Sequence, residues 1–160
     1  MCDYSLHVFP NRLAVDGEEL VVHRFGGASI GLAARADVEA MERRHAEAAR
    51  RWSWSKIKRW FEVQRETDRG ICAVCVPPGA RLLLRDIPRN LQRELEVCES
   101  EEAGFVEITA EAHRYRDAVR FANGRQILLQ ALHEGQRVTV LSLESAVMDE
   151  PLVLELRMAG

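Results

Sequence analysis

Short apolar stretches that alternate with polar residues, separated by turn residues, run through most of the sequence. Successive side chains of a strand point to opposite faces, so this alternation predicts half-buried β-strands. The clearest stretches are 13–15, 20–25, 115–121, 126–132, 137–143 and 152–158. Asn123-Gly124 is a strong hairpin signal, and Asp16-Gly17 predicts a second hairpin with a primed turn, which needs positive φ. We therefore expect a chain built mainly of β-strands.

Two segments predict helix instead. The stretch from Asp37 to Gln64 is rich in Ala, Glu and Arg, and Asp37 is a candidate N-cap. Asn90 to Val97 predicts a short helix capped by Asn90, followed by an acidic loop at 99–102. Further strands are expected near 1–8, 29–33, 71–76 and 81–87. The predicted fold class is α+β, with an antiparallel β-meander or small barrel-like sheet, one long basic helix and one short helix.

The length of 160 residues fits a single domain, 1–160, with a helical insertion at about 36–66 between β-rich halves. A chain of this size buries roughly two thirds of its unfolded surface, so it needs no disulfide or metal to fold. No apolar run approaches the roughly 18 residues that cross a bilayer. The first residues lack the basic and apolar segments of a signal peptide. We expect a cytoplasmic protein with reduced cysteines.

Charge is distributed unevenly along the chain. The formal net charge is −3, which argues against specific binding of nucleic acid by the molecule as a whole. Residues 43–59 nevertheless hold seven basic side chains and one acidic one, and Trp52, Trp54 and Trp60 fall in or beside this block. Trp54 and Phe61 share a helix face with Ile57, which predicts an apolar stripe with a basic back. The segment 43–61 therefore either packs on the sheet or contacts an anionic membrane or a partner protein.

Cys2 is the first candidate for chemistry. If Met1 is removed, the chain begins with a cysteine that carries both an amine and a thiol. The amine, with a pKa near 8, can act as the base for the thiol, as in N-terminal nucleophile amidohydrolases. The same two groups can bind a metal, and the simplest alternative is a small buried residue on the first strand.

Cys72 and Cys75 have the spacing of a zinc or redox pair, but their surroundings argue against a shared site. A zinc site of this kind needs a second pair of ligands, and the sequence holds no second CxxC or HxxxH. The motif lies in an apolar run closed by Pro77-Pro78, which is typical of a strand. Residues three apart on a strand face opposite sides, so at most one of the two sulfurs belongs to a site.

His23 shares a strand face with Val21 and Phe25 and is expected to point inward. A buried imidazole needs a partner, which here is a backbone carbonyl, a thiolate or a metal. His7, His45 and His133 are expected at the surface.

Cys2, His23 and Cys75 thus lie on apolar faces of three candidate strands. If these strands are neighbours, the three side chains form a metal site for Fe, Zn or Cu. Cys2 and His23 can equally act as a catalytic thiol and its base. The expected partner is a metal or small molecule. The functional alternatives are this Cys/His centre, an N-terminal-cysteine amidohydrolase, and a non-enzymatic adaptor that uses the basic Trp-rich helix.

Several stretches carry a resemblance that covers most of the chain: 1–6, 11–14, 21–25, 75–82 and 115–118. With these the chain resembles a group of small bacterial proteins that begin Met-Cys-Asp-Tyr-Ser-Leu. The resemblance implies no particular activity.

Overall fold

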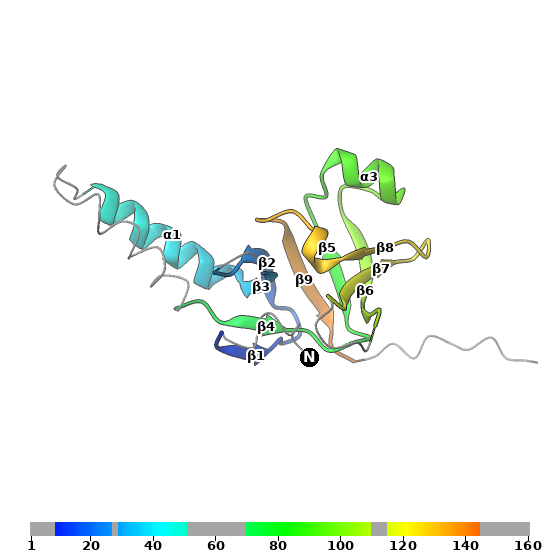
Figure 1. Cartoon of the computed structure of the whole chain (residues 1–160), viewed down its shortest axis with the longest axis horizontal. Coiled ribbons are helices and arrows are strands. Elements are labelled where there is room, and N and C mark those ends of the chain that lie inside the picture. Colours follow the sequence, from blue (N-terminus) through cyan, green and yellow to red (C-terminus); the bar gives the residue numbers. More distant parts are fainter. Residues whose placement is uncertain (1–8, 27–28, 51–69, 110–114, 145–160) are drawn as a thin grey trace, which may run out of the picture.

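A computed structural model of the chain describes residues 9–26, 29–50, 70–109 and 115–144. The described strands form one mixed sheet of nine strands, in the order β1-β4-β3-β2-β9-β5-β6-β7-β8 (Figure 1). The strands are β1 (Asn11–Leu13), β2 (Glu19–Arg24), β3 (Ile30–Ala34), β4 (Ala73–Cys75), β5 (Arg81–Leu84), β6 (Glu101–Glu107), β7 (Asp117–Phe121), β8 (Gln126–Leu128) and β9 (Arg137–Ser142). The helices are α1 (Arg35–Arg50), α3 (Arg89–Leu95) and the short 3₁₀ helix η4 (Leu129–Ala131). The predicted α+β class is confirmed.

Strand β9 lies between two groups of strands, β1-β4-β3-β2 on one side and β5-β6-β7-β8 on the other. It pairs with β2 on one side and with β5 on the other, both antiparallel. Strands β5 to β8 follow one another as an antiparallel meander. Among the described strands the sheet ends at β1 and β8, so these strands do not form a closed barrel.

The predicted hairpin of 13–15 with 20–25 is wrong. Strand β1 pairs in parallel with β4, and the neighbours of β2 are β3 and β9. The turn between β1 and β2 is also not primed, because only Gly17 (φ 77°) has positive φ there and Asp16 does not. At Asn123-Gly124 the hairpin exists, but again only the glycine (φ 83°) is left-handed.

Three further expectations need correction. The acidic loop predicted at 99–102 is wrong for its last two residues, because β6 begins at Glu101 and runs to Glu107. Its alternation is hard to see in the sequence, since only Ala103 and Phe105 are buried on it. Helix α3 begins at Arg89 after Pro88 without a side-chain cap, so Asn90 is a helix residue and not its cap. The predicted strand 126–132 ends at Leu128 and continues as η4.

The two faces of the sheet carry two separate apolar cores. The large core takes alternate residues from almost every strand and adds Leu91 and Leu95 from α3. The small core lies on the other face of the β2-β3-β4 region, and its buried members are Phe25, Ala33, Ile71, Ala73 and Cys75. Phe9, Val38 and Met41 pack against it. Alternation along β2 explains the division, because Leu20 and Val22 enter the large core whereas Phe25 enters the small one.

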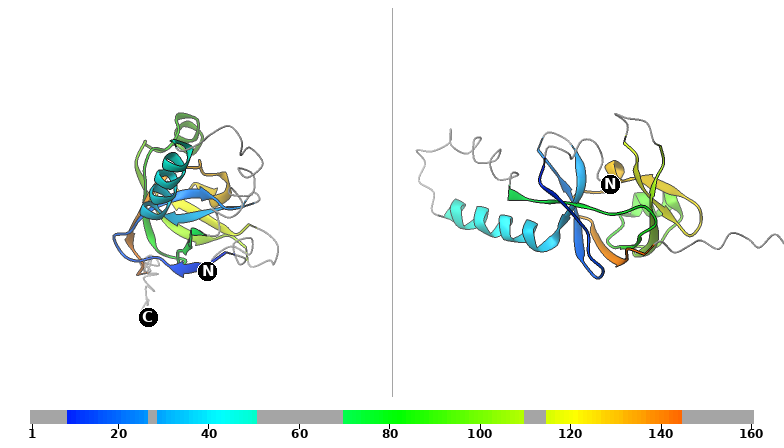
Figure 2. Two further views of the ribbon diagram at one scale, coloured as in Figure 1. Left: turned by 90° about the vertical axis from the view of Figure 1, so that its left-hand side faces the viewer. Right: turned by 90° about the horizontal axis from the view of Figure 1, so that it is seen from below.

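Helix α1 follows β3 directly and begins two residues before the expected Asp37. It covers the small core through its first turns, and residues 42–47 are exposed, including His45 as expected. Two views agree that the helix extends away from one end of the sheet, while α3 and β5–β8 lie at the other (Figure 2). The tryptophan block lies outside the described residues, so its role stays a prediction. None of the described helices is long and apolar enough to span a membrane.

Candidate functional site

Two of the three predicted site residues are buried on the face of the sheet that carries the small core. His23 lies on β2 and is 8% exposed, and Cys75 lies at the end of β4 and is 7% exposed. The ring of His23 meets Phe25 edge-on, with centroids 4.9 Å apart and an interplanar angle of 87°. Phe25 belongs to the same buried cluster as Cys75. The inward orientation predicted for His23 is therefore confirmed.

Strand pairing explains why these side chains share a face. His23 pairs with Gly31, and Val21 pairs with Ala33, across β2 and β3. Ala33 in turn pairs with Ala73 across β3 and β4. Residues directly opposite on neighbouring strands point to the same face. Cys75 is two residues beyond Ala73, so it lies on the same face as His23.

The cysteines differ in their chemical state. Cys75 is disulfide-bonded, whereas Cys72 and Cys98 are free thiols. The expectation of four reduced cysteines is therefore wrong for Cys75. Cys72 is not its partner, which agrees with the prediction that residues three apart on a strand diverge. Cys2, the fourth cysteine, lies outside the described residues.

Within the described ranges, no group of three or more His, Cys, Asp or Glu side chains could hold a metal ion. Cys2 lies outside these ranges, so the predicted set of Cys2, His23 and Cys75 stays a prediction. The same is true of a nucleophile at Cys2.

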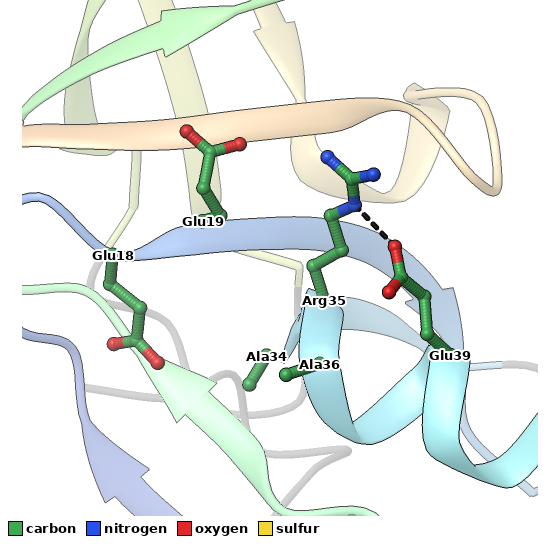
Figure 3. A pocket seen from close by; sticks show the side chains of 6 residues that line it. All are labelled: Glu18, Glu19, Ala34, Arg35, Ala36 and Glu39. Carbon is green, nitrogen blue, oxygen red and sulfur yellow. Dashed lines mark hydrogen bonds and ion pairs between the residues drawn. The ribbon is translucent and has the colours of Figure 1, made fainter.

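A shallow pocket of about 340 Å³ lies where β2, the preceding turn and α1 meet (Figure 3). It is lined by Glu18, Glu19, Ala34, Arg35, Ala36 and Glu39. Each carboxylate already has a partner. Arg35 Nε donates to Glu39 at 2.6 Å, and Thr139 Oγ1 donates to Glu19 at 2.7 Å. The acidic groups are thus engaged within the protein, and the pocket offers no free cation site.

Glu18 is held by Arg12 and by the backbone N–H of Val15, which donates to it at 3.0 Å. The hydrogen bond from Arg12 lowers the pKa of Glu18 below its usual range, and the same contact raises the pKa of Arg12. This pair fastens β1 to the turn that leads into β2. It is a structural contact at the rim of the pocket.

Two further polar residues are buried besides His23. Asp117 and Gln136 are each 3% exposed. Gln136 follows the Glu134-Gly135 turn and its backbone carbonyl accepts from Val22 N at 2.9 Å. Gln136 lies two and four residues before Val138 and Val140, which are both in the large core. Because alternate residues of a strand share a face, this spacing could have predicted that Gln136 is buried.

The chain was compared with protein-family models, with curated proteins and with solved structures, and none of the three comparisons found a match.

Proposed function

We propose that the chain carries a thiol–disulfide centre made of Cys2, Cys75 and His23, whose reduced form binds a transition metal. The observation that carries the proposal is the disulfide at Cys75. The chain has four cysteines, and two of them, Cys72 and Cys98, are free. The remaining candidate within the chain is Cys2.

The strand register supports a place for His23 in this centre. If the β3–β4 pairing continues two residues beyond Ala33 and Ala73, Cys75 stands opposite Gly31, which is the partner of His23. Glycine has no side chain, so β3 would place no obstacle between the imidazole and the sulfur. Strands two apart are separated by about 10 Å, which leaves room for one further group between the two side chains. The sulfur of Cys2 or a metal ion would occupy that room.

The proposed redox step is a two-electron exchange with an external dithiol. A thiolate of the dithiol attacks one sulfur of the Cys2–Cys75 bond, that bond breaks, and a mixed disulfide forms. The second thiol of the reductant then attacks the reductant's own sulfur in the mixed disulfide and displaces the cysteine that was bonded to it. The reductant leaves as a disulfide and the chain holds two thiols. Because Cys75 is 7% exposed, a protein reductant would attack the sulfur of Cys2. His23 would accept a proton from the reduced pair and favour the thiolate.

The reduced centre offers two thiolates and one imidazole. These soft ligands suit Zn, Fe or Cu, and three protein ligands leave one position open. Metal binding and the disulfide exclude one another, because both use the same sulfur atoms. A Cys2 thiol that is locked in a disulfide also cannot act as an N-terminal nucleophile, so the amidohydrolase alternative applies only to a reduced chain.

The disulfide is tested by mapping the non-reduced, aerobically purified chain by mass spectrometry. We expect a peptide containing Cys2 linked to one containing Cys75, with Cys72 and Cys98 alkylated without prior reduction. Cys75→Ala should remove the link and Cys98→Ala should not. Alkylation of all four cysteines in the unreduced, denatured chain would exclude the proposed pair.

The metal is tested on the reduced chain under anaerobic conditions. After incubation with Zn²⁺ and removal of the excess, elemental analysis should find about one equivalent per chain. Cys75→Ser and His23→Ala should lose most of it, and Cys98→Ser should keep it. If the disulfide forms reversibly but the reduced chain binds no stoichiometric Zn, Fe or Cu, the thiol–disulfide part of the proposal stands and the metal part is refuted.

A further inference from the structure

Helix α1 meets the sheet through few side chains. Only the beginning of the helix lies beside the sheet, and the rest extends away from it (Figures 1 and 2). Val38 and Met41 pack against the small core, and because they are three residues apart they lie on one face of the helix. The ion pairs of α1, from Arg35 and Arg43 to Glu39, join residues of the helix itself. Besides the chain connection from β3, the attachment of α1 therefore depends on the small core.

The small core has far fewer buried residues than the large core. Five described residues are buried in it, and twenty-one are buried in the large core. Two of the five, Ala33 and Ala73, have side chains of a single methyl group. Most of the apolar volume comes from Phe25 and Ile71, and Cys75 is the remaining member. Because local opening takes place where few buried apolar contacts are lost, we expect the small core to open more easily than the large one.

The disulfide at Cys75 lies in this small core and stabilises it. A disulfide restricts the unfolded chain, so its loss weakens the part of the structure to which it is bonded. Reduction by an external dithiol transfers two electrons: the sulfur–sulfur bond breaks, the chain gains two thiols, and the dithiol becomes a disulfide. The thiol of Cys75 can then ionise, and a thiolate among apolar side chains costs free energy. Both effects favour opening of the small core after reduction.

We propose that the disulfide at Cys75 is a redox switch that controls the attachment of α1 to the sheet. In the oxidised chain the small core is closed, and Val38 and Met41 hold the helix on it. In the reduced chain the small core opens and α1 separates, while the large core stays folded because the two cores share no buried residue. The 16-residue helix then frays, since isolated helices of this length are marginal in water. The inference rests on the disulfide of the proposed function and not on its metal.

Hydrogen exchange of the full-length chain, followed by mass spectrometry with and without dithiothreitol, tests the switch. Both samples contain a metal chelator, so that metal binding cannot close the reduced core. We expect the amides of 35–47 to exchange at least about tenfold faster after reduction and those of β5, β6 and β7 to change by less than about twofold. Cys75→Ser should exchange like the reduced chain under both conditions. Cys98→Ser alters an exposed free cysteine and is the matched control, which should respond like the unmodified chain.

Met41→Asp tests the contact of the helix with the small core. It should speed exchange of 35–47 in the oxidised chain and remove the response to dithiothreitol, whereas Ala46→Asp, at an exposed position of the same helix, should keep that response. Equal exchange of 35–47 in the two redox states, with the disulfide verified by peptide mapping, would overturn the inference and leave the proposed function standing. Loss of protection in the large core together with α1 would also overturn it, because the unfolding would then be global. A chain without any disulfide at Cys75 would refute both the inference and the proposed function.

Discussion

Arg12 and Glu18 form an ion pair that links β1 to the entry of β2. The Glu18 side chain is 14% exposed and also accepts the backbone N–H of Val15. The folded chain stabilises the ionised carboxylate, and for this reason the pKa of Glu18 lies below its usual range. A carboxyl whose pKa is depressed by folding adds stability above the pKa of the unfolded chain and loses it as the pH falls.

Glu18→Gln should therefore change the acid branch of the stability curve. In the unmodified chain, Glu18 should contribute fully to the free energy of unfolding above about pH 4.5 and progressively less at lower pH. The variant should be less stable by about 1 kcal/mol at pH 7 and should lose less stability on acidification. Urea unfolding between pH 3 and pH 7 measures both effects.

Glu102→Gln is the control, because the pair of Glu102 with Arg81 is exposed on both sides. That variant should follow the unmodified chain at every pH within a few tenths of a kcal/mol. A Glu18→Gln curve parallel to that of the unmodified chain would show that Glu18 titrates alike in the folded and unfolded chains. The pKa of Asp86 is lowered by Arg137, so Asp86 also makes stability depend on pH. Because Asp86 is present in the unmodified chain and in both variants, its contribution cancels when they are compared.

At the scale of elements, the β7–β8 turn closes the end of α3. Asn123 Nδ2 donates to the carbonyls of Leu95 at 2.8 Å and Glu96 at 3.1 Å. Glu96 itself has left-handed φ and ψ of 55° and 49°, which ends the helix. The last carbonyls of a helix have no partner within it. A side chain 27 residues away therefore supplies the donors that these carbonyls need.

Asn123→Ala should lower the free energy of unfolding by about 1–2 kcal/mol, because it removes both donors. Asn123→Asp distinguishes the helix end from the turn. Aspartate keeps an oxygen that can accept from Arg125 N, as Asn123 Oδ1 does at 3.0 Å, but it cannot donate to the helix. Both variants should lose similar stability in urea unfolding. Full stability of Asn123→Asp would mean that the turn contact, and not the helix end, is what matters.

At the scale of the whole molecule, Gln130 fastens η4 to β3. Its Oε1 accepts from Ile30 N at 2.9 Å, and its Nε2 donates to Ile30 O at 2.6 Å. The two residues are 100 positions apart in sequence. Together with β9, this contact joins the first strands to the last third of the chain.

Gln130→Ala should cost about 1–3 kcal/mol, since it leaves two partly buried backbone groups without their partner. Gln130→Glu keeps the acceptor and loses the donor, so it should be destabilised as well at neutral pH. Gln126→Ala, at an exposed position of β8, should be close to neutral. Denaturant unfolding followed by fluorescence gives the free energy of unfolding of the three variants. If Gln130→Ala is as stable as the unmodified chain, the two hydrogen bonds between Gln130 and Ile30 do not stabilise the sheet.

Sequence alone determined the features that depend on neighbours along the chain. Alternation placed His23 and Phe25 on one face of β2, and the apolar spacing on 137–143 gave β9, because a strand fixes which side chains point together. It also separated Cys72 from Cys75 for the same reason. The hairpin at Asn123-Gly124 arises from a local turn, which closes with little loss of chain entropy.

Only the tertiary structure decided which strands became neighbours. The parallel pairing of β1 with β4 joins residues about 60 positions apart, and no turn signal encodes it. Strand β6 was not predicted because it has few apolar residues. It forms a strand because β5 and β7 pair with it on both sides, and these pairings are set by the tertiary structure. The disulfide at Cys75 has the same origin, since a bond between sulfurs requires proximity in space, and proximity between distant residues is set by packing of the whole sheet.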